Sequence, residues 1–568
     1  MEPTILKCHS LEVVALMGMV LICADPGRAE SAEGIRFAIR DRVIGQVDHR
    51  LFGEFMERAS WGEPGPEAAR APGTRQLQPS VVARLREMQL PVIRFPGGTD
   101  VDFIDWCDLV DNVPGRGKER PATTKGHTGQ EITNNFGYDE FLRLCEELGA
   151  EPLIVLNFRD GLLRVKPLEE ATRHAAGLVA YCNAPVGAKP AGGMPDWARV
   201  RALNGHGEPY GVRYFEIGNE TGFFWDGIKG LGMSEDQAVD WYMGCLEAYV
   251  EAVRAVDPSV EIIVDGDVRP IRGLIKQRLG DRVQHLAHHR YLPWVWSEVR
   301  KEGAPYPGEE LTAEEIWNAL VGVPDIHPST GVSLDRAAIY QVAREGGYKV
   351  AITEWNWNGW WARQEVSPAL DSSFAKGIGA AGFLHAFMRE KEVVSLGCQS
   401  MLVGINWGIT AIRADQTGEE PAYFLPTGQV TMFYGKHHGP DMLEVVCENV
   451  PRYAQPYGMG DIGPKGTPVA CIDALATADE KTIYFHAINR SFSEDLEISV
   501  DVSEFTGLGP AATQHCFEGR LHDAPLEGEA REMGFFRSGE VRLQGTTLRL
   551  TLPKRSVSIV EVPCKRRR

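Results

Sequence analysis

Between about residues 50 and 410, short apolar runs alternate with longer stretches of helical periodicity. Eight of the runs have the length and composition of buried strands. They are HRLFGEFME (49–57), PVIRFPGG (91–98), EPLIVLNF (151–158), VRYFEIGNE (212–220), VEIIVDGD (260–267), VQHLAHHRY (283–291), YKVAITEW (348–355) and SMLVGINW (400–407). Strand and helix alternating at this spacing predict a parallel sheet with helical crossovers. Eight such units predict an α/β fold closed into a (β/α)8 TIM barrel.

An open, doubly wound sheet is the alternative architecture. Such sheets usually carry a glycine-rich phosphate loop after the first strand. Here Gly97 and Gly98 lack the downstream glycine and lysine of those loops. The barrel is therefore favoured, with extra length in insertions at 101–135 and 292–332.

The hydrophobic pattern of the sequence changes after about residue 436. Runs such as KTIYFHAINR and SVSIVEVP alternate apolar and polar residues between turns, which is typical of an antiparallel β-sandwich. We predict a leader at 1–30, an N-terminal strand at 31–48 that joins the sandwich, the barrel at 49–435, and a C-terminal antiparallel β-sandwich at 436–568.

The first residues resemble an export signal. Lys7 precedes the apolar run LEVVALMGMVLICA (11–24), which is followed by small residues. This pattern favours a secretory leader, with an uncleaved N-terminal helix as the alternative. The run is short for a membrane anchor. We expect a secreted or periplasmic protein without membrane association after leader removal.

The formal net charge of -19 bears on the partners. An acidic surface repels nucleic acid and anionic membranes, so neither is expected as a partner. The charge fits a neutral or weakly charged substrate. Assembly into a homo-oligomer is left open. His285, His288 and His289 lack a companion glutamate in HExxH spacing, so hydrogen bonding is favoured over zinc binding, and no metal or organic cofactor is expected.

Polar residues recur where the predicted strands end. In barrels of this kind the active site lies at the C-terminal ends of the strands, so these side chains should converge on one mouth. They are Glu57, Arg94, Asn157, Asn219, Glu220, Asp265, Asp267, His288, His289, Tyr291, Glu354, Trp355, Asn406 and Trp407. Asp265 and Asp267 are interpreted equally well as substrate contacts or as helix caps. Glu216 lies deeper in its strand and is expected to pair with an arginine or lysine.

Carboxylates beside tryptophans indicate sugar chemistry. Cleaving a glycosidic bond takes one carboxylic acid to protonate the leaving oxygen and a second carboxylate to attack the anomeric carbon or activate water. Glu220 and Glu354 supply this pair after the fourth and seventh strands. The aromatic segments 223–225 and 355–361 beside them offer faces for a sugar ring.

Two stretches around these glutamates resemble a known group of enzymes. YFEIGNET (214–221) and ITEWNW (352–357) are similar to the acid/base and nucleophile strands of the retaining glycoside hydrolases of clan A. FGEFMER (52–58), VIRFPGGT (92–99) and PTGQVTMFYGKHHG (426–439) narrow the resemblance to family 51, the α-L-arabinofuranosidases. The resemblance covers nearly all of the chain after the leader, in the same order.

This resemblance implies a role for each matching residue. Glu220 would be the general acid/base, and Glu354 the nucleophile of a double displacement on a plant-type carbohydrate. Glu57 would hold the sugar ring, Arg94 would help keep the nucleophile ionised, and Tyr291 would donate a hydrogen bond to it. The full set of predicted substrate-binding residues is Glu57, Arg94, Thr99, Asn219, His288, His289, Tyr291, Trp355 and Asn406.

One position departs from the family pattern. Thr99 stands where the family has an asparagine that contacts the sugar, so the glycone is open. Another clan A specificity (endoglucanase, xylosidase or uronidase) is the first alternative. A non-catalytic carbohydrate-binding protein is the second, and the presence of both carboxylates argues against it.

Overall fold

The computed structural model describes residues 34–292, 299–301, 304–305, 313–326, 334–358, 373–459, 465–519, 521 and 534–566. The leader predicted at 1–30 therefore lies outside the described residues. Residues from Ile35 onward form one compact unit. Within the described part of the chain, no helix combines the length and the apolar character needed to cross a bilayer.

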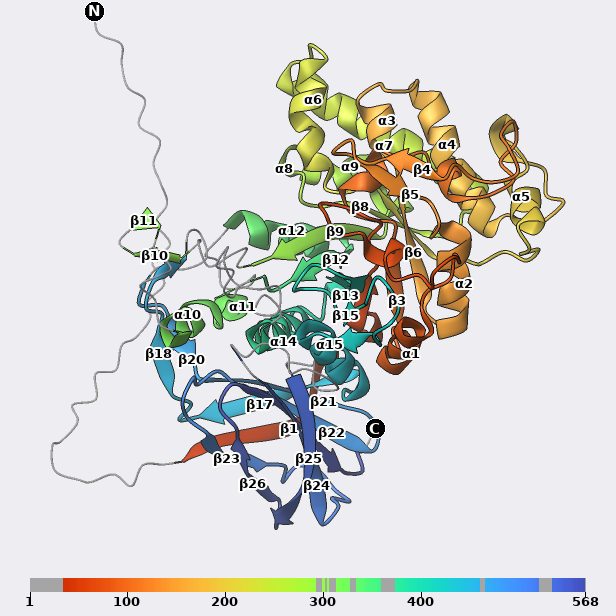
Figure 1. Cartoon of the computed structure of the whole chain (residues 1–568). Coiled ribbons are helices and arrows are strands. Elements are labelled where there is room, and N and C mark those ends of the chain that lie inside the picture. Colours follow the sequence, from red (N-terminus) through yellow and green to blue (C-terminus); the bar gives the residue numbers. More distant parts are fainter. Residues whose placement is uncertain are drawn as a thin grey trace, which may run out of the picture. The chain divides into compact units, whose positions relative to one another are not determined.

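Eight parallel strands close into a barrel, as the sequence predicts (Figure 1). In order around the ring they are β2 (Gly53–Phe55), β3 (Val92–Phe95), β6 (Glu151–Leu156), β7 (Tyr214–Ile217), β8 (Glu261–Asp265), β9 (His285–Tyr291), β12 (Lys349–Asn356) and β13 (Val394–Ser400). Alternate side chains from all eight strands fill the barrel interior with an apolar cluster, including Phe55, Leu153, Ile263 and Leu396.

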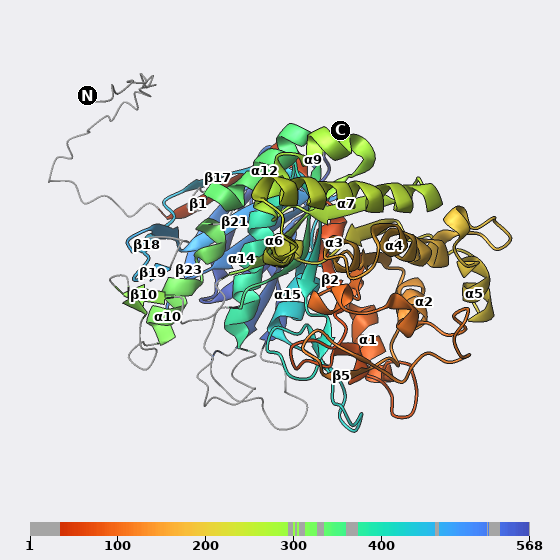
Figure 2. The same ribbon diagram turned by 90° about the horizontal axis from the view of Figure 1, so that it is seen from above.

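A helix follows each strand before the next one begins. These helices are α1 (Pro79–Met88), α2 (Tyr138–Leu148), α4 (Leu168–Asn183), α7 (Glu235–Val256), α9 (Ile275–Leu279), α12 (Leu334–Gly346), α14 (Phe374–Arg389) and α15 (Pro426–Lys436). The long helix α7 runs alongside α4 (Figure 2). It begins at a capping box, in which Ser234 and Gln237 each accept a hydrogen bond from the other's backbone amide.

The eighth strand lies earlier than the sequence predicts. Strand β13 ends at Ser400, whereas the prediction placed the strand at 400–407. The observed strand carries Ser395, Gln399 and Ser400, and the apolar segment Met401–Gly404 follows it directly, so the hydrophobic pattern favours the later segment. Beyond it, β14 (Val403–Gly404) pairs in a small sheet with β15 (Ile412–Arg413), which in turn pairs with β16 (Tyr423–Phe424).

The C-terminal strands form a second, mostly antiparallel sheet that also closes on itself. Its order is β1 (Ile35–Gln46), β17 (Asp441–Glu448), β21 (Ile472–Ala478), β22 (Thr482–Asn489), β27 (Ser556–Pro563), β24 (Ala511–Gly519), β25 (Gly534–Gln544), β26 (Thr547–Leu552) and β23 (Leu496–Asp501). The N-terminal strand β1 pairs antiparallel with β17 and parallel with β23. Figure 1 shows this red strand among the blue ones.

Candidate active site

Glu220 and Glu354 meet at the C-terminal end of the barrel although 134 positions separate them in the sequence. An oxygen of each carboxylate and a ring nitrogen of His289 all lie within 4.8 Å of one another. Nδ1 of His289 is 3.0 Å from Glu220 Oε1 and 3.6 Å from Glu354 Oε2. The Glu220 side chain is 30% exposed and that of Glu354 only 8%, so solvent reaches one acid far better than the other.

An irregularity in β12 aims two consecutive side chains into the site. The pairing of β12 with β9 and with β13 shifts register just before Glu354. In a regular strand Thr353 and Glu354 would point to opposite faces. Here the Thr353 hydroxyl donates to buried Glu216 and Glu354 faces Arg94.

Arg94 connects the strand that carries Glu354 to the strand that precedes Glu220. Its guanidinium donates to Glu354 Oε1 (2.8 Å), to Asn219 Oδ1 (2.9 Å) and to Glu216 Oε2 (2.6 Å). The prediction that Glu216 pairs with a cation is confirmed. Arg94 is fully buried, so all three contacts act in a low-dielectric surrounding where charge pairing is strong.

The surroundings of Glu354 favour its ionised form. Burial would raise the pKa of this carboxyl, but the charges of His289 and Arg94 and hydrogen bonds from Arg94 and Tyr291 lower it below its ordinary value. The Tyr291 hydroxyl donates to Glu354 Oε2 at 2.9 Å, and Ser400 Oγ lies 2.6 Å from the same hydroxyl. An ionised, oriented carboxylate at this position has the properties of a nucleophile.

Of the adjacent histidines, His289 belongs to the site and His288 does not touch the acids. Nε2 of His289 is 3.0 Å from the Thr353 hydroxyl, whose own proton goes to Glu216. That nitrogen must therefore be a donor. Burial lowers the pKa of His289, but the charge of Glu354 and the hydrogen bond to Glu220 outweigh burial and raise it to about 10. His288 instead contacts Asp267 through Nδ1 (2.8 Å).

Glu220 lies in a tight turn, and two aspartates bind the backbone amides of the residues before and after it. Its backbone is left-handed (φ 45°, ψ 45°), an uncommon conformation for a residue other than glycine. The amide before the turn, Asn219 N–H, donates to Asp102, and the amide after it, Thr221 N–H, donates to Asp265. Burial raises the pKa of both aspartates to about 6. The sequence did not predict Asp102 as a site residue, because it lies in the insertion after the second barrel strand and not at a strand end.

The pair Asp265 and Asp267 accepts hydrogen bonds from segments next to the acids. Asp265 binds the backbone of the Glu220 turn, and Asp267 binds the ring of His288 and the backbone amide of His289. Both position neighbouring segments, and Asp265 does so by accepting the first amide of the 3-10 helix Thr221–Phe224, as a helix cap does.

Glu57 reaches the site from the end of β2. Burial and repulsion from Glu354 raise its pKa well above the ordinary value. A β-carbon at Gly98 would lie 1.7 Å from Glu57 Oε1, so the glycine-rich turn after β3 leaves room for this carboxyl. Thr99, which begins the short 3-10 helix Thr99–Asp102, is partly exposed beside that turn.

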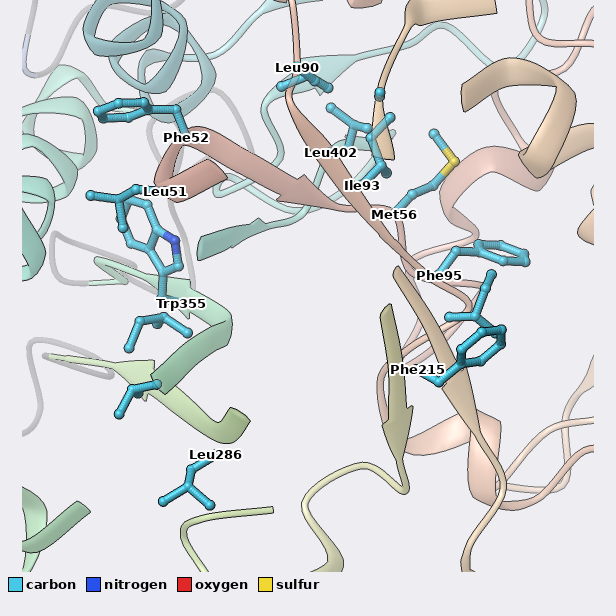
Figure 3. Packing of buried hydrophobic residues seen from close by; sticks show 14 of the residues in the cluster. Leu51, Phe52, Met56, Leu90, Ile93, Phe95, Phe215, Leu286, Trp355 and Leu402 are labelled. Carbon is cyan, nitrogen blue, oxygen red and sulfur yellow. The ribbon is translucent and has the colours of Figure 1, made fainter. Parts of the chain in front are cut away.

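Two predicted sugar contacts lie elsewhere. Trp355 is fully buried and packs on Phe383 and Phe387 of α14, because it follows Glu354 and points to the outer face of β12. Figure 3 shows its indole among aliphatic side chains of the core. Asn406, beyond the end of β13, uses its amide group to donate to the backbone of Gly62. Trp357 is also buried, and the remaining tryptophans of that segment lie outside the described residues.

Two glutamates with a histidine between them are also a set of ligand types that bind metals. In this structure Glu220 is hydrogen-bonded to His289, and Glu354 is hydrogen-bonded to Arg94 and Tyr291. Glu354, whose ionised form is favoured, faces the more exposed Glu220, as a nucleophile faces an acid/base in a glycosidase.

Comparisons with known proteins agree with this geometry. The model of a family described as "Alpha-L-arabinofuranosidase 1 domain" matches residues 84–297. A probable α-L-arabinofuranosidase C of Aspergillus niger is 28% identical over 522 residues, which cover 85% of this chain and 91% of the relative. An intracellular exo-α-(1→5)-L-arabinofuranosidase of Halalkalibacterium halodurans is 24% identical over 494 residues, covering 82% and 86%.

Solved structures of arabinofuranosidases share the fold of this chain. The α-L-arabinofuranosidase of Thermotoga maritima in an arabinose complex superposes with a TM-score of 0.70 at 21% identity, covering 93% of this chain and 100% of the other. The GH51 arabinofuranosidase of Xanthomonas axonopodis pv. citri gives 0.70 at 22% identity, covering 93% and 99%. The chain is therefore similar to α-L-arabinofuranosidases over most of its length, and it shares the fold of the solved GH51 arabinofuranosidases.

Proposed function

We propose that the chain is a retaining α-L-arabinofuranosidase that acts on plant-type polysaccharides or oligosaccharides. The spacing of the two acids carries the proposal, since their nearest ligand oxygens lie within 4.8 Å. Retaining glycosidases hold their carboxyl groups about 5–5.5 Å apart, whereas inverting enzymes leave about 6.5–9.5 Å for a water. The short spacing favours double displacement.

In the first step Glu354 attacks the anomeric carbon while protonated Glu220 gives its proton to the leaving oxygen. The bond to the aglycone breaks and an ester bond to Glu354 forms. In the second step the Glu220 carboxylate takes a proton from water, the water oxygen bonds to the anomeric carbon, and Glu354 leaves. The greater exposure of Glu220 supports its role, because it must meet both the leaving group and the incoming water.

Asn219 and Glu57 are assigned to the sugar. Because a guanidinium only donates hydrogen bonds, Arg94 fixes the Asn219 side chain with its oxygen inward. The amide NH2 is then left to donate to the hydroxyl beside the anomeric carbon. Glu57, whose pKa is raised by burial and by repulsion from Glu354, is placed to form a hydrogen bond with a ring hydroxyl.

The substrate class is supported by the relatives, whose names specify α-L-arabinofuranosidases. Thr99 in place of the family asparagine keeps a second candidate, another clan A glycosidase, in consideration. A screen with aryl glycosides of α-L-arabinofuranose, xylose, glucose and glucuronic acid separates the two, with Glu354→Ala as the blank. Release from the arabinofuranoside alone is expected. Preferential release from another glycoside would select the second candidate, and sugar binding without any release would favour a binding protein.

Three organisational features are part of the proposal. The C-terminal ring of strands packs as a sandwich around its own apolar cluster, which includes Phe37, Phe485 and Val560. The domain boundary lies near residue 436, between α15 and β17. Export through the leader at 1–30 is tested by N-terminal sequencing of the mature protein.

A further inference from the structure

Three side chains on the C-terminal sheet gather nitrogen and oxygen ligands outside the catalytic site. His437 follows helix α15, His515 lies in β24 and Glu561 lies in β27. One ligand atom from each lies within 4.8 Å of the other two. Nδ1 of His437 is 2.7 Å from Glu561 Oε1, and Nε2 of His515 is 3.7 Å from Glu561 Oε2.

The sheet itself places His515 beside Glu561. In the antiparallel pair of β24 with β27, Thr513 lies opposite Glu561 and His515 opposite Ile559. Positions two residues apart share a face of the sheet, so His515 and Glu561 are diagonal neighbours on one face.

A hydrogen bond on the other side of its ring orients His515. Ser538 lies directly opposite His515 in β25, and its Oγ is 2.7 Å from Nδ1. Nε2 therefore points toward Glu561, and this buried atom has no hydrogen bond. A histidine held through one nitrogen, with the other directed at a cluster of ligands, is the arrangement that surrounds metal-bound histidines.

We propose that His437, His515 and Glu561 bind a divalent transition metal of the Zn²⁺ type. Two imidazoles and one carboxylate are a ligand set that suits Zn²⁺ and leaves a fourth position for water. The three side chains are 24%, 19% and 30% exposed, so the cluster borders solvent although Nε2 of His515 is itself covered.

The ion would join two parts of the fold. His437 ends the last helix of the barrel, while the other two ligands belong to the C-terminal sheet. An ion that binds only this folded arrangement stabilises it by mass action. Saturating Zn²⁺ is therefore expected to raise Tm by a few degrees without any change in the catalytic residues.

The test is a Zn²⁺ titration of the full chain against a chromophoric chelator, combined with thermal unfolding. The variant His437→Gln/His515→Gln keeps polar side chains of similar size and is expected to lose one bound ion per chain and the rise in Tm. His206→Gln is the matched control. His206 pairs with Glu146 at 3.0 Å on another surface and should leave both readouts unchanged.

A further variant separates this cluster from the catalytic site. Glu220, His289 and Glu354 also bring three ligand atoms together, so Glu354→Gln is titrated in parallel. Loss of the ion in the double variant, with the ion retained in Glu354→Gln, supports the proposal. The reverse pattern, or Zn²⁺ binding that is equal in the wild type and the double variant, would overturn it.

Discussion

Arg94 matters most among single residues because it sets the charge of one acid and the orientation of a sugar-binding amide. It donates at once to Glu354 and to Asn219, and its third contact, Glu216, offsets its charge within the barrel. Removing one member of such a buried network leaves its partners uncompensated. Loss of Arg94 would therefore mix catalytic and folding effects, and a milder change tests the charge of Glu354 more cleanly.

Tyr291→Phe removes a single hydrogen bond to Glu354 Oε2 and keeps the aromatic ring. A hydrogen bond to a charged group is worth about 1.5–3 kcal/mol, so we expect kcat to fall roughly ten- to a hundredfold. Because this bond lowers the pKa of Glu354, its loss raises that pKa, and the acidic limb of the kcat/KM profile should move to higher pH.

The control for Tyr291→Phe is Ser400→Ala, which removes the other partner of the Tyr291 hydroxyl but leaves the bond to Glu354 in place. It is expected to change kcat less than the phenylalanine variant does. An unchanged acidic limb in Tyr291→Phe would show that Tyr291 does not hold Glu354 ionised.

At the scale of elements, a tight turn orients Glu220 and an irregularity in strand β12 orients Glu354. The register shift in β12 turns Thr353 and Glu354 to the same side, and Asp102 and Asp265 clamp the left-handed turn at Glu220. Such local departures from regular geometry recur at functional sites, where the surrounding structure maintains them.

Gly98→Ala tests the glycine-rich turn after β3. The new methyl group would lie 1.7 Å from Glu57 Oε1, and φ is +62° at this position, so Glu57 must move. We expect a rise in KM and a fall in kcat/KM for the aryl arabinofuranoside, since Glu57 is assigned to the sugar.

Gly129→Ala is the matched comparison for Gly98→Ala. Its φ is also positive (+82°), but nothing lies within 4 Å of the added carbon. It should lower stability through backbone strain and leave KM unchanged. Equal KM values in both alanine variants would contradict the packing argument for Glu57.

The sequence predicted elements well where periodicity changes abruptly and poorly where it does not. Seven barrel strands, and the meeting of Glu220 with Glu354, follow from apolar runs that end in polar residues. The eighth strand is displaced because its own residues include Ser395, Gln399 and Ser400, whereas the segment directly after it, Met401–Gly404, is apolar. The sequence predicts Trp355 as a sugar contact because it directly follows Glu354. Side chains alternate along a strand, so Trp355 instead points into the hydrophobic core. The role of Asp102 depends on the folding of an insertion, which a single sequence does not specify.

For the whole molecule, buried charge determines how stability depends on pH. Glu54 in β2 is fully buried, beside Gln399 in the neighbouring strand, and burial raises its pKa well above the ordinary value. A carboxyl whose folded-state pKa is raised favours folding below its unfolded pKa, about 4.3, and this contribution is lost as the pH rises toward the folded pKa.

Glu54→Gln should therefore be more stable than the wild type at neutral pH, by a few degrees in Tm. The difference should shrink to near zero below about pH 4, where both side chains are neutral. Urea unfolding across this pH range measures it. Buried Glu63 provides the contrast, since it accepts four backbone amides, and Glu63→Gln should be less stable than the wild type at neutral pH. A pH-independent difference between wild type and Glu54→Gln would contradict the account.

The central claim, that Glu354 becomes covalently bonded to the sugar opposite Glu220, is tested most directly by trapping the intermediate. Glu220→Ala slows the second step, so incubation with an activated aryl α-L-arabinofuranoside should leave a glycosylated protein for peptide mass spectrometry. The predicted result is one pentosyl unit on the peptide that contains Glu354. A pentosyl unit on a different residue, or wild-type turnover that inverts the anomeric configuration, would contradict it.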